Sequence, residues 1–303
     1  MGKIAWMFSG QGAQYTGMGK SLSECSCAAR AVFDMAETLR PGTFQQCISA
    51  DKETLSITRN TQPCLFCVDL AAACALAEKG GKADFLAGFS LGEIPALAFG
   101  GYLSYKDAFS FVCRRAQEMD RCALTHPGVM YAVVKLSAEK VRELCQAFSK
   151  CWPVNYNSPA QTVVACCKEE GQEFSAVVKA AGGKALPLPV SGAFHSPFME
   201  EASQELAKTF SDLRFSLPHI PVMANLTGCA YEGPGQLFDQ VCHPVQWQKT
   251  VEGLADKGVD TFVEVGAGKT LSGLTAKILP QARVLNVQDA ESLTYTWEVL
   301  SSC

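Results

Sequence analysis

Short apolar runs alternate with amphipathic stretches along this chain, and most of the apolar runs end in glycine or polar residues. Residues 3–8 (KIAWMF), 84–87 and 261–265 are compact apolar runs that predict buried strands. Between them lie stretches with apolar positions three or four residues apart, such as residues 107–122 and 200–210, which predict helices. Strands that alternate with helices are typical of a parallel sheet covered by helices. We therefore expect an α/β fold.

Residues 129–190 have a different pattern, in which short strands and helices follow the order β-α-β-β-α-β. The expected strands are residues 129–135, 152–157, 161–167 and 184–190, and the expected helices are residues 137–148 and 169–181. This order is that of the ferredoxin-like unit. We predict a small ferredoxin-like α+β domain at residues 127–191, inserted into a larger α/β domain formed by residues 1–126 and 192–303.

Two further helices are expected before the second predicted strand. Residues 19–39 read as one surface helix, and residues 64–79 read as a buried one. Thr61-Gln62-Pro63 precedes the second, and proline suits the first turn of a helix because that turn leaves its N–H groups unpaired.

Composition narrows the classes of function and partner. The chain has 303 residues, 48% of them hydrophobic, with a net charge of -4 and a mean hydropathy of +0.08. This length is enough for a large core, and the acidic balance argues against nucleic acid as a partner. No apolar run approaches the length of a bilayer span, and the apolar start of the chain is too short for a signal peptide. We expect a cytoplasmic protein without a membrane partner.

The fifteen cysteines do not suggest a disulfide framework, since the number is odd and the compartment is expected to be reducing. Cys64 and Cys67 form the only C-x-x-C pair, and no second pair or nearby histidine completes a zinc site. We interpret these cysteines as small buried hydrophobic side chains. Neither a metal nor an organic cofactor is expected.

Gly88-Phe-Ser90-Leu-Gly92 is a G-x-S-x-G motif between a predicted strand and an Ala-rich run that ends in Gly100-Gly101. A strand, this motif and a helix in that order form a nucleophile elbow, in which the turn is too tight for a side chain at either glycine. The serine then lies at a helix start, where free N–H groups can stabilise an oxyanion. Ser90 is the candidate nucleophile.

An active serine needs a base, and the chain offers four histidines. His126, His219 and His243 lie next to prolines in expected loops, whereas His195 follows the inserted unit at a predicted strand-to-helix junction. His195 is therefore the best candidate. Glycines around Gln11 do not form a phosphate loop, because G-x-G-x-x-G and a Walker lysine are absent; they let the Gln11 amide approach a site at the end of the first strand.

Motifs in a fixed order along nearly the whole chain carry a resemblance to the malonyl-CoA:acyl carrier protein transacylase family, the acyltransferases of fatty acid synthesis. The matching segments are Phe8-Ser-Gly-Gln-Gly-Ala-Gln14 with Gly17-Met-Gly19, Thr61-Gln-Pro63, Gly88-Phe-Ser-Leu-Gly-Glu93, Arg115-Ala-Gln-Glu-Met119, Gly192-Ala-Phe-His-Ser196, Pro221-Val-Met-Ala-Asn225, Pro244-Val-Gln-Trp247 and Glu264-Val-Gly-Ala-Gly268. The resemblance implies an α/β-hydrolase-like large domain with a parallel sheet and a ferredoxin-like small domain.

The resemblance also implies roles for single residues. Ser90 matches the nucleophile that takes up malonyl as an ester, and His195 matches the general acid and base. The oxyanion hole corresponds to Gln11 and the backbone N–H of Leu91. The family orients its histidine with a backbone carbonyl, here expected from His243, which would also place a second imidazole near the site.

Arg115 matches the arginine that binds the free carboxylate of malonyl, with Arg114 as the rival in a one-residue slip. Gln62 is expected to support the same carboxylate, and Phe194 resembles the malonyl-type pocket rather than the methylmalonyl-type. Phe89 departs from the family pattern, which often has histidine there, and Pro95 lies unusually within the elbow helix.

The implied activity is ping-pong transfer of malonyl from malonyl-CoA to the phosphopantetheine thiol of acyl carrier protein, by a monomer. Three alternatives remain open: an acyltransferase that serves a polyketide synthase, an editing acyl hydrolase of the same fold, and a non-catalytic binding subunit. Retention of Arg115 argues against the hydrolase, and the intact set of site residues argues against the binding subunit. Lys249, Lys269 and Lys277 are candidates for contacts with an acidic carrier protein.

Overall fold

A computed structural model of the chain describes residues 2–302. The protein is built on two sheets, a parallel one of five strands and an antiparallel one of four. The strands are β1 Lys3–Phe8, β2 Phe85–Gly88, β3 Gly128–Val134, β4 Cys151–Ser158, β5 Gln161–Cys167, β6 Lys184–Pro187, β7 Val222–Met223, β8 Val259–Val265 and β9 Arg283–Val287. The expected combination of a parallel sheet with an inserted antiparallel unit is confirmed.

Fourteen helices and three 3-10 turns connect these strands within the described residues. The helices are α1 Lys20–Cys25, α2 Cys27–Leu39, α3 Thr43–Ser49, α4 Lys52–Ser56, α5 Thr58–Glu78, α6 Glu93–Phe99, α7 Tyr105–Thr125, α8 Ala138–Cys145, α9 Gly171–Ala180, α10 Glu200–Thr209, α11 Gly235–Asp239, α12 Trp247–Asp256, α13 Thr270–Ile278 and α14 Ala290–Ser301. The 3-10 turns are η1 Ser90–Gly92, η2 Pro197–Met199 and η3 Gln240–Cys242.

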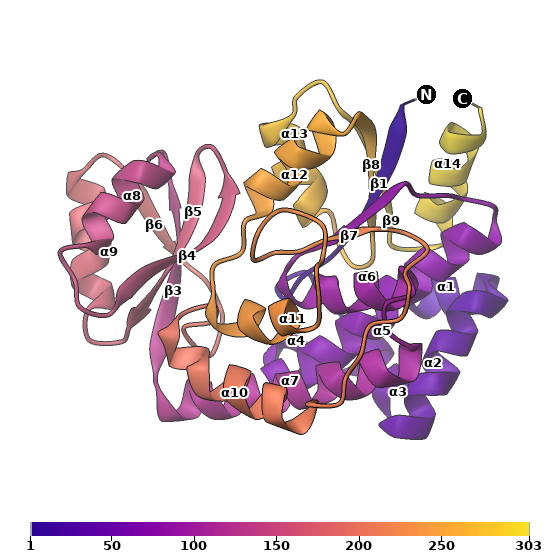
Figure 1. Ribbon diagram of the computed structural model, residues 1–303, viewed down its shortest axis with the longest axis horizontal. Coiled ribbons are helices and arrows are strands. Elements are labelled where there is room, and N and C mark those ends of the chain that lie inside the picture. Colours follow the sequence, from indigo (N-terminus) through magenta and orange to yellow (C-terminus); the bar gives the residue numbers. More distant parts are fainter. Residues whose placement is uncertain (1, 303) are drawn as a thin grey trace.

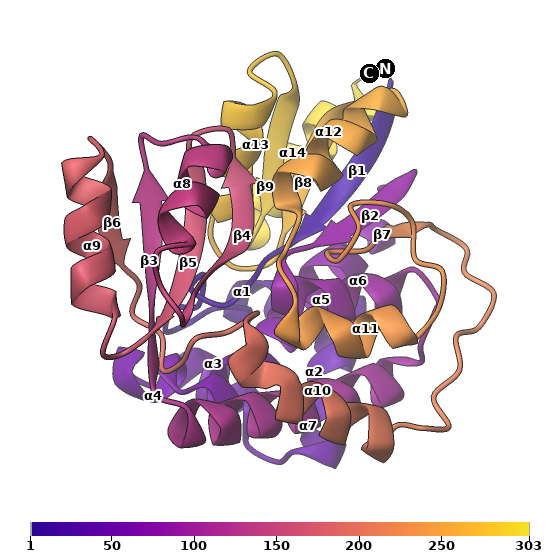
Figure 2. The same cartoon turned by 60° about the vertical axis from the view of Figure 1, so that its left-hand side comes forward.

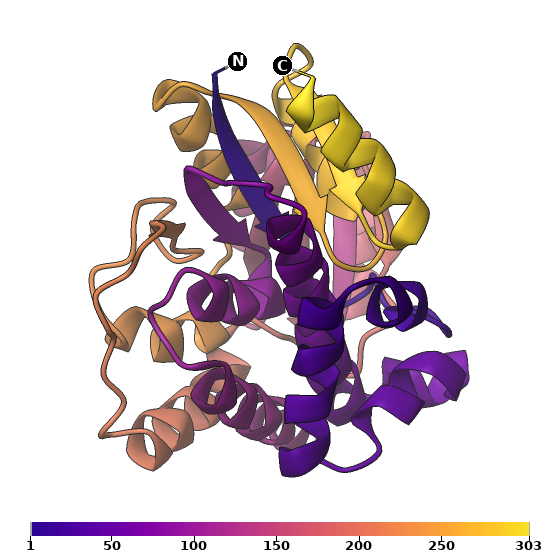
Figure 3. The ribbon, with the colours of Figure 1, turned by 90° about the vertical axis from the view of Figure 1, so that its right-hand side faces the viewer.

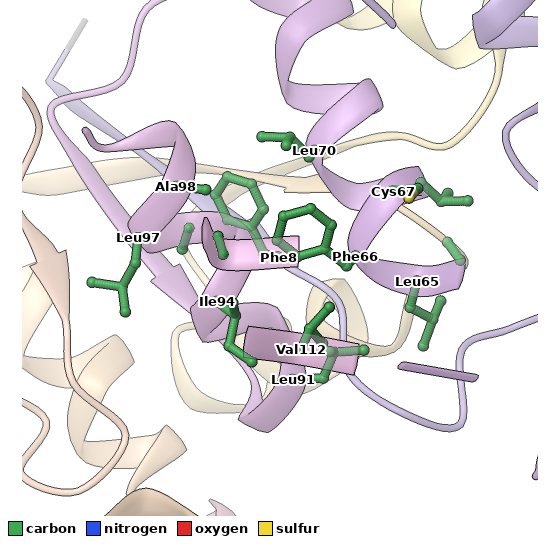
Figure 4. Packing of buried hydrophobic residues seen from close by; sticks show 14 of the residues in the cluster. Phe8, Leu65, Phe66, Cys67, Leu70, Leu91, Ile94, Leu97, Ala98 and Val112 are labelled. Atoms are coloured by element: carbon green, nitrogen blue, oxygen red, sulfur yellow. The ribbon is translucent and has the colours of Figure 1, made fainter. Parts of the chain in front are cut away.

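The parallel sheet has the strand order β7-β2-β1-β8-β9, so β1 lies at its centre and the strand that leads into the elbow lies beside it. Alternate residues of β1 enter different cores: Trp6 and Phe8 pack on the face covered by α5, and Ala5 and Met7 pack on the face covered by α12 and α13. Helices on both faces explain why the strand is apolar at successive positions. Figure 4 shows Phe8 among buried side chains of α5 and α6.

The antiparallel sheet has the order β4-β5-β3-β6, which is the arrangement of a ferredoxin-like unit. One face packs on α8 and α9 through a small core that includes Val133, Val164 and Phe174. The other face, with Met130 and Val163, is turned toward the rest of the protein. In Figures 1 and 2 this unit stands beside the parallel sheet, and its outer side carries the two helices.

The helix expected at residues 19–39 is in fact two helices, α1 and α2. Ser26 separates them with an extended backbone (φ -135°, ψ 124°), and its hydroxyl accepts the Ala29 N–H as an N-cap of α2. A serine that caps a helix competes with continuous helical pairing, and a periodicity of apolar positions does not reveal such a break.

Helix α5 begins at Thr58, earlier than expected, so that Pro63 lies inside the helix rather than in its first turn. The 21-residue helix is long and apolar enough to cross a membrane, although no apolar run of that length was expected from the sequence. In the structure 89% of its most apolar window is buried against the rest of the protein, as the core helix of a folded domain would be. Figure 3 shows it in the foreground, running downward from the parallel strands.

Candidate active site

Ser90 lies at the end of β2, in the 3-10 turn η1 that leads into α6. Its φ of 54° is in the left-handed region that non-glycine residues rarely adopt, as expected of a nucleophile elbow. A Cβ at Gly88 would overlap the backbone of Gly92 and Glu93, and a Cβ at Gly92 would overlap the Phe8 carbonyl. Both glycines of the motif are therefore required by packing. Pro95 is the third residue of α6, where its missing N–H would have had no helical partner.

His195 and Ser90 are brought together from distant parts of the chain. The His195 Nε2 lies 2.7 Å from the Ser90 Oγ, and the His195 Nδ1 lies 2.9 Å from the main-chain oxygen of Gln240. Because a carbonyl only accepts, Nδ1 carries the hydrogen and Nε2 is left to accept the serine proton. The ring comes from the turn before η2, where His195 has a φ of 60°, rather than from a strand end, since β6 stops at Pro187.

Burial sets the ionisation of His195, which is 4% exposed. Burial and, to a lesser degree, the charge of Arg115 lower the pKa of His195 to about 4, and the carbonyls of Gln240 and His243 only partly oppose this. The imidazole is therefore neutral at ordinary pH, the state that a general base needs.

The carbonyl that orients His195 differs from the one expected. Gln240 provides the hydrogen bond, and the His243 backbone makes a smaller contribution to the pKa. Gln240 is the first residue of η3 and His243 directly follows this turn, so the two carbonyls are only three residues apart in the sequence and a match to the family motif does not separate them. The His243 imidazole is exposed and binds the Asp239 carbonyl at 2.8 Å, so it is not a second imidazole in the site.

The Arg115 side chain extends from α7 to the Ser90 hydroxyl and is 1% exposed. Its Nη2 donates to the Ser90 Oγ at 3.2 Å and to the Gln240 Oε1 at 2.8 Å, and its Nη1 donates to the Gln62 Oε1 at 2.8 Å. Burial lowers the pKa of Arg115 to about 10, partly offset by Glu93 and Tyr231. The guanidinium thus remains charged at neutral pH beside the candidate nucleophile.

Arg114 lies at the surface, whereas Gln62 is buried beside Arg115. Arg114 is partly exposed and pairs with Glu118 at 2.8 Å and Glu205 at 3.3 Å, so its charge is used at the surface. Gln62 is buried and offers its oxygen to Arg115, while its amide nitrogen points to the Met119 sulfur at 3.4 Å. In this geometry Gln62 supports the arginine and does not itself reach a carboxylate.

A cavity of about 330 Å³ opens in front of Ser90 and His195. Outside the antiparallel unit, its wall includes Gln11, Phe194 and, on α13, Thr270, Leu271 and Leu274. The strands of the antiparallel unit contribute Met130, Ala132, Asn155, Asn157, Gln161 and Val163. The Gln11 Nε2 contacts the Thr58 Oγ1 at 3.3 Å, and Leu91 follows the serine within η1. The wall is mostly apolar with a few amides, which suits an uncharged chain such as the arm of a thioester.

Three buried residues around Ser90 were not recognised from the sequence as site residues: Glu93, Asn225 and Gln240. The Asn225 Oδ1 accepts the Ser90 N–H at 2.6 Å, and the Gln240 Nε2 donates to the Ser90 carbonyl at 2.7 Å. Glu93 and Asn225 fall inside segments that carry the family resemblance, which is the one signal that marked them. Gln240 lies just before such a segment and carried no signal of its own.

No group of three histidine, cysteine, aspartate or glutamate side chains that could hold a metal ion occurs within residues 2–302. The cysteines described by the structure are all free.

The chain is similar to known proteins over nearly its whole length. Residues 5–295 match the family described as "Acyl transferase domain". The chain is 34% identical to the malonyl CoA-acyl carrier protein transacylase of Bacillus subtilis, over 99% of this chain and 98% of that protein. A crystal structure of the enzyme of the same name from Clostridium perfringens superposes with a TM-score of 0.95 at 33% identity, covering 99% of this chain and 98% of the other.

A second similar structure is a malonyl-transacylase in complex with a type II polyketide synthase acyl-carrier protein. It has a TM-score of 0.94 at 32% identity and covers 98% of this chain and 99% of the other. The likeness extends over nearly the full length in each comparison.

Proposed function

Because this chain belongs to the acyl transferase domain family, we propose that it transfers malonyl from malonyl-CoA to the phosphopantetheine thiol of acyl carrier protein, for fatty acid biosynthesis. One observation carries the choice of acyl group: the Arg115 guanidinium lies 3.2 Å from the Ser90 hydroxyl. A buried cation at this distance favours an acyl group with a second, free carboxylate. A monoacyl group has no carboxylate to offer this guanidinium.

The first half-reaction begins with Ser90. His195 takes the hydroxyl proton at Nε2 as the serine oxygen attacks the thioester carbonyl. The Leu91 N–H and the Gln11 amide stabilise the oxyanion. The C–S bond then breaks, the CoA sulfur receives the proton from His195, and malonyl remains as an ester on Ser90.

The second half-reaction reverses these steps with a different thiol. The phosphopantetheine thiol gives its proton to His195 and attacks the ester carbonyl, and the Ser90 oxygen leaves with that proton. Arg115 holds the free carboxylate throughout, so the acyl group keeps its position while the thiols exchange. Gln240 keeps His195 in the required tautomer by accepting from Nδ1.

The cytoplasm is the proposed location, supported by the free cysteines, which persist in a reducing compartment. For carrier docking, Lys269 is the best placed of the three lysine candidates. It is exposed and directly precedes Thr270, which lines the cavity. Lys249 and Lys277 are also exposed, on α12 and α13.

Intact-mass analysis tests the proposal directly. The protein is incubated separately with malonyl-CoA and with acetyl-CoA, and then with holo acyl carrier protein. We expect a malonyl adduct on the wild type, its loss when the carrier is added, and no adduct on Ser90→Ala. An equal acetyl adduct, or an adduct that persists in Ser90→Ala, would refute the proposal.

The pathway is tested by the choice of carrier. Discharge of the malonyl-enzyme is compared with a fatty acid carrier and a type II polyketide carrier at equal concentrations. Faster discharge to the fatty acid carrier is the expected result. Rapid discharge to water without any carrier would instead identify an acyl hydrolase.

A further inference from the structure

Glu93 is a fully buried carboxylate that the reaction steps above do not use. It is the first residue of α6, and each of its oxygens accepts from a different residue: Oε1 from the Asn225 N–H at 2.6 Å, and Oε2 from the side-chain amide of Gln240. A carboxylate is costly to bury, and both hydrogen bonds go to residues that touch the nucleophile.

Asn225 and Gln240, the two residues bound to Glu93, hydrogen-bond to the N–H and the carbonyl of Ser90. The Asn225 Oδ1 accepts the Ser90 N–H at 2.6 Å, and its Nδ2 donates to the Gly88 carbonyl. The Gln240 Nε2 donates to the Ser90 carbonyl at 2.7 Å. Because the Ser90 φ of 54° is unfavourable, this backbone must be held by its surroundings.

Glu93 also fixes which way the Gln240 amide points. An ionised carboxylate can only accept, so the NH2 end of the amide must face Glu93. The oxygen end then faces Arg115, whose Nη2 donates to it at 2.8 Å. Were the amide reversed, its NH2 group would meet the guanidinium, donor against donor.

The main chain of Gln240 completes the connection. Its carbonyl accepts from the His195 Nδ1 at 2.9 Å, so one residue contacts both the base and the arginine. We propose that Glu93 is a positioning residue whose ionised carboxylate, through Asn225 and Gln240, sets the relative placement of nucleophile, base and arginine. This inference rests on the proposed malonyl transfer, because that reaction requires all three groups.

The ionisation of Glu93 gives the proposal a distinctive signature. Burial raises the pKa of Glu93 to about 7, against the lowering effects of its hydrogen bonds and of the Arg115 charge. The titratable groups that face it are Arg115 on α7 and Tyr231 after β7, and His195 is linked to it through Gln240. Protonation adds a donor and removes an acceptor, which frees the Gln240 amide to turn.

The rate of malonylation should therefore fall as the pH drops through about 7. Titration of His195 would produce a fall only near its own pKa, which burial lowers to about 4. The position of the acidic limb distinguishes the two groups.

A second buried glutamate serves as the matched control. Glu264 is also fully buried, and its oxygens accept from the main-chain N–H groups of Leu271 at 3.0 Å and Ser272 at 2.7 Å. Glu264→Gln therefore measures what the loss of a buried carboxylate does to stability. It should not change the ratio of malonyl to acetyl labelling.

The experiment compares wild type, Glu93→Gln, Gln240→Met, the double variant and Glu264→Gln. The readouts are the rate of adduct formation from malonyl-CoA and acetyl-CoA between about pH 5 and pH 9, and the Tm. We expect Glu93→Gln to slow malonylation about 100-fold, as small misplacements of reacting groups do, to lower the malonyl preference and to abolish the limb near pH 7. The double variant should be about as slow as the slower single variant, because the two residues act as one unit.

The proposal is overturned if the wild type shows no acidic limb near pH 7, or if Glu93→Gln loses only Tm, as Glu264→Gln does. Multiplication of the two single effects in the double variant would also overturn it, since Glu93 would then act independently of Gln240. If Glu93→Gln does not fold, Gln240→Met decides the matter: it removes one of the two links to Glu93, so the acidic limb near pH 7 should shrink, and an unchanged pH profile would overturn the proposal. A wild type that takes up no malonyl refutes the proposed function instead.

Discussion

The Arg115 Nη2 lies 3.2 Å from the Ser90 Oγ, so the cation contacts the very atom on which the acyl group is proposed to be carried. An acyl ester on that oxygen must place its far carboxylate close by, within the reach of a guanidinium. Malonyl has a single methylene between its two carbonyl carbons, which fits such a short span. The distance thus bears on chain length as well as on charge.

Replacement of Arg115 should change selectivity more than folding. We expect Arg115→Ala to reduce the rate of malonylation about 100-fold or more, because a buried charge-assisted pair with the substrate is lost. Labelling by acetyl-CoA should fall far less. Initial rates with the two thioesters, measured by intact mass, give the ratio.

Arg114→Ala is the neighbouring control, since Arg114 pairs at the surface with Glu118 and Glu205. It should keep the malonyl preference of the wild type. Loss of that preference in Arg114→Ala, with Arg115→Ala unchanged, would mean that the carboxylate binds in the other register.

Stability should depend on pH through His195. Burial lowers its folded pKa from 6.5 to about 4, so below about 6.5 the unfolded chain takes up a proton that the folded protein does not. The free energy of unfolding therefore falls as the pH drops from about 6.5 to about 4, by roughly 3 kcal/mol in total. Denaturant titrations of wild type and His195→Gln at several pH values measure the difference.

Glu93 has the opposite dependence, because its raised pKa means that the folded state holds a proton between 4.5 and about 7 that the unfolded chain releases. It is present in both proteins, so the comparison isolates His195. A gap between the two stabilities that stays constant with pH would contradict the assignment.

The glycines of the elbow should not tolerate alanine. A Cβ at Gly88 or Gly92 overlaps backbone atoms that cannot move aside. We expect each variant to lose about 3 kcal/mol or more, or to fail to fold. Gly273→Ala is the matched control, since Gly273 is in α13 and its added Cβ would meet no atom within 4 Å beyond its own stretch of helix. It should be neutral or stabilising by up to about 1 kcal/mol. Equal effects at all three positions would show that the overlap is not the cause.

The break between α1 and α2 should be sensitive to its cap. Ser26→Ala removes the acceptor of the Ala29 N–H and should cost about 1 kcal/mol of unfolding free energy. Ser26→Asp keeps an acceptor and should retain most of the stability, as measured by urea titration. If alanine stabilises the protein, the two helices are better joined than capped.

Features governed by local sequence were predicted closely. The strands β1 and β5 have the expected bounds, and both elbow glycines are required for the reason given by the motif. An apolar run bounded by breakers and a turn without room for a side chain are properties of a few adjacent residues, so a single sequence reveals them.

Features that depend on distant partners were predicted less well. Pro63 was expected to start a helix, yet α5 begins five residues earlier because packing of the buried helix outweighs one missing N–H. The acceptor of His195 lies 45 residues away in the sequence, and Glu93 and Asn225, which are 132 residues apart, acquire their roles only when their segments meet. The spacing of residues along the chain does not reveal which distant segments come into contact in the fold.

The antiparallel unit is joined by main-chain pairing to the segment before α12, which β4 meets at Val245. Val245 donates to the Val154 carbonyl at 2.9 Å, and the Tyr156 N–H donates to the Val245 carbonyl at 2.9 Å. Val245 lies a few residues after Gln240, whose carbonyl orients His195, and β4 also forms part of the cavity wall. Any rocking of the antiparallel unit would thus pull on the segment that aligns the base. The Val245 and Tyr156 amides should therefore exchange their hydrogens at a different rate when the acyl cavity is occupied than when it is empty.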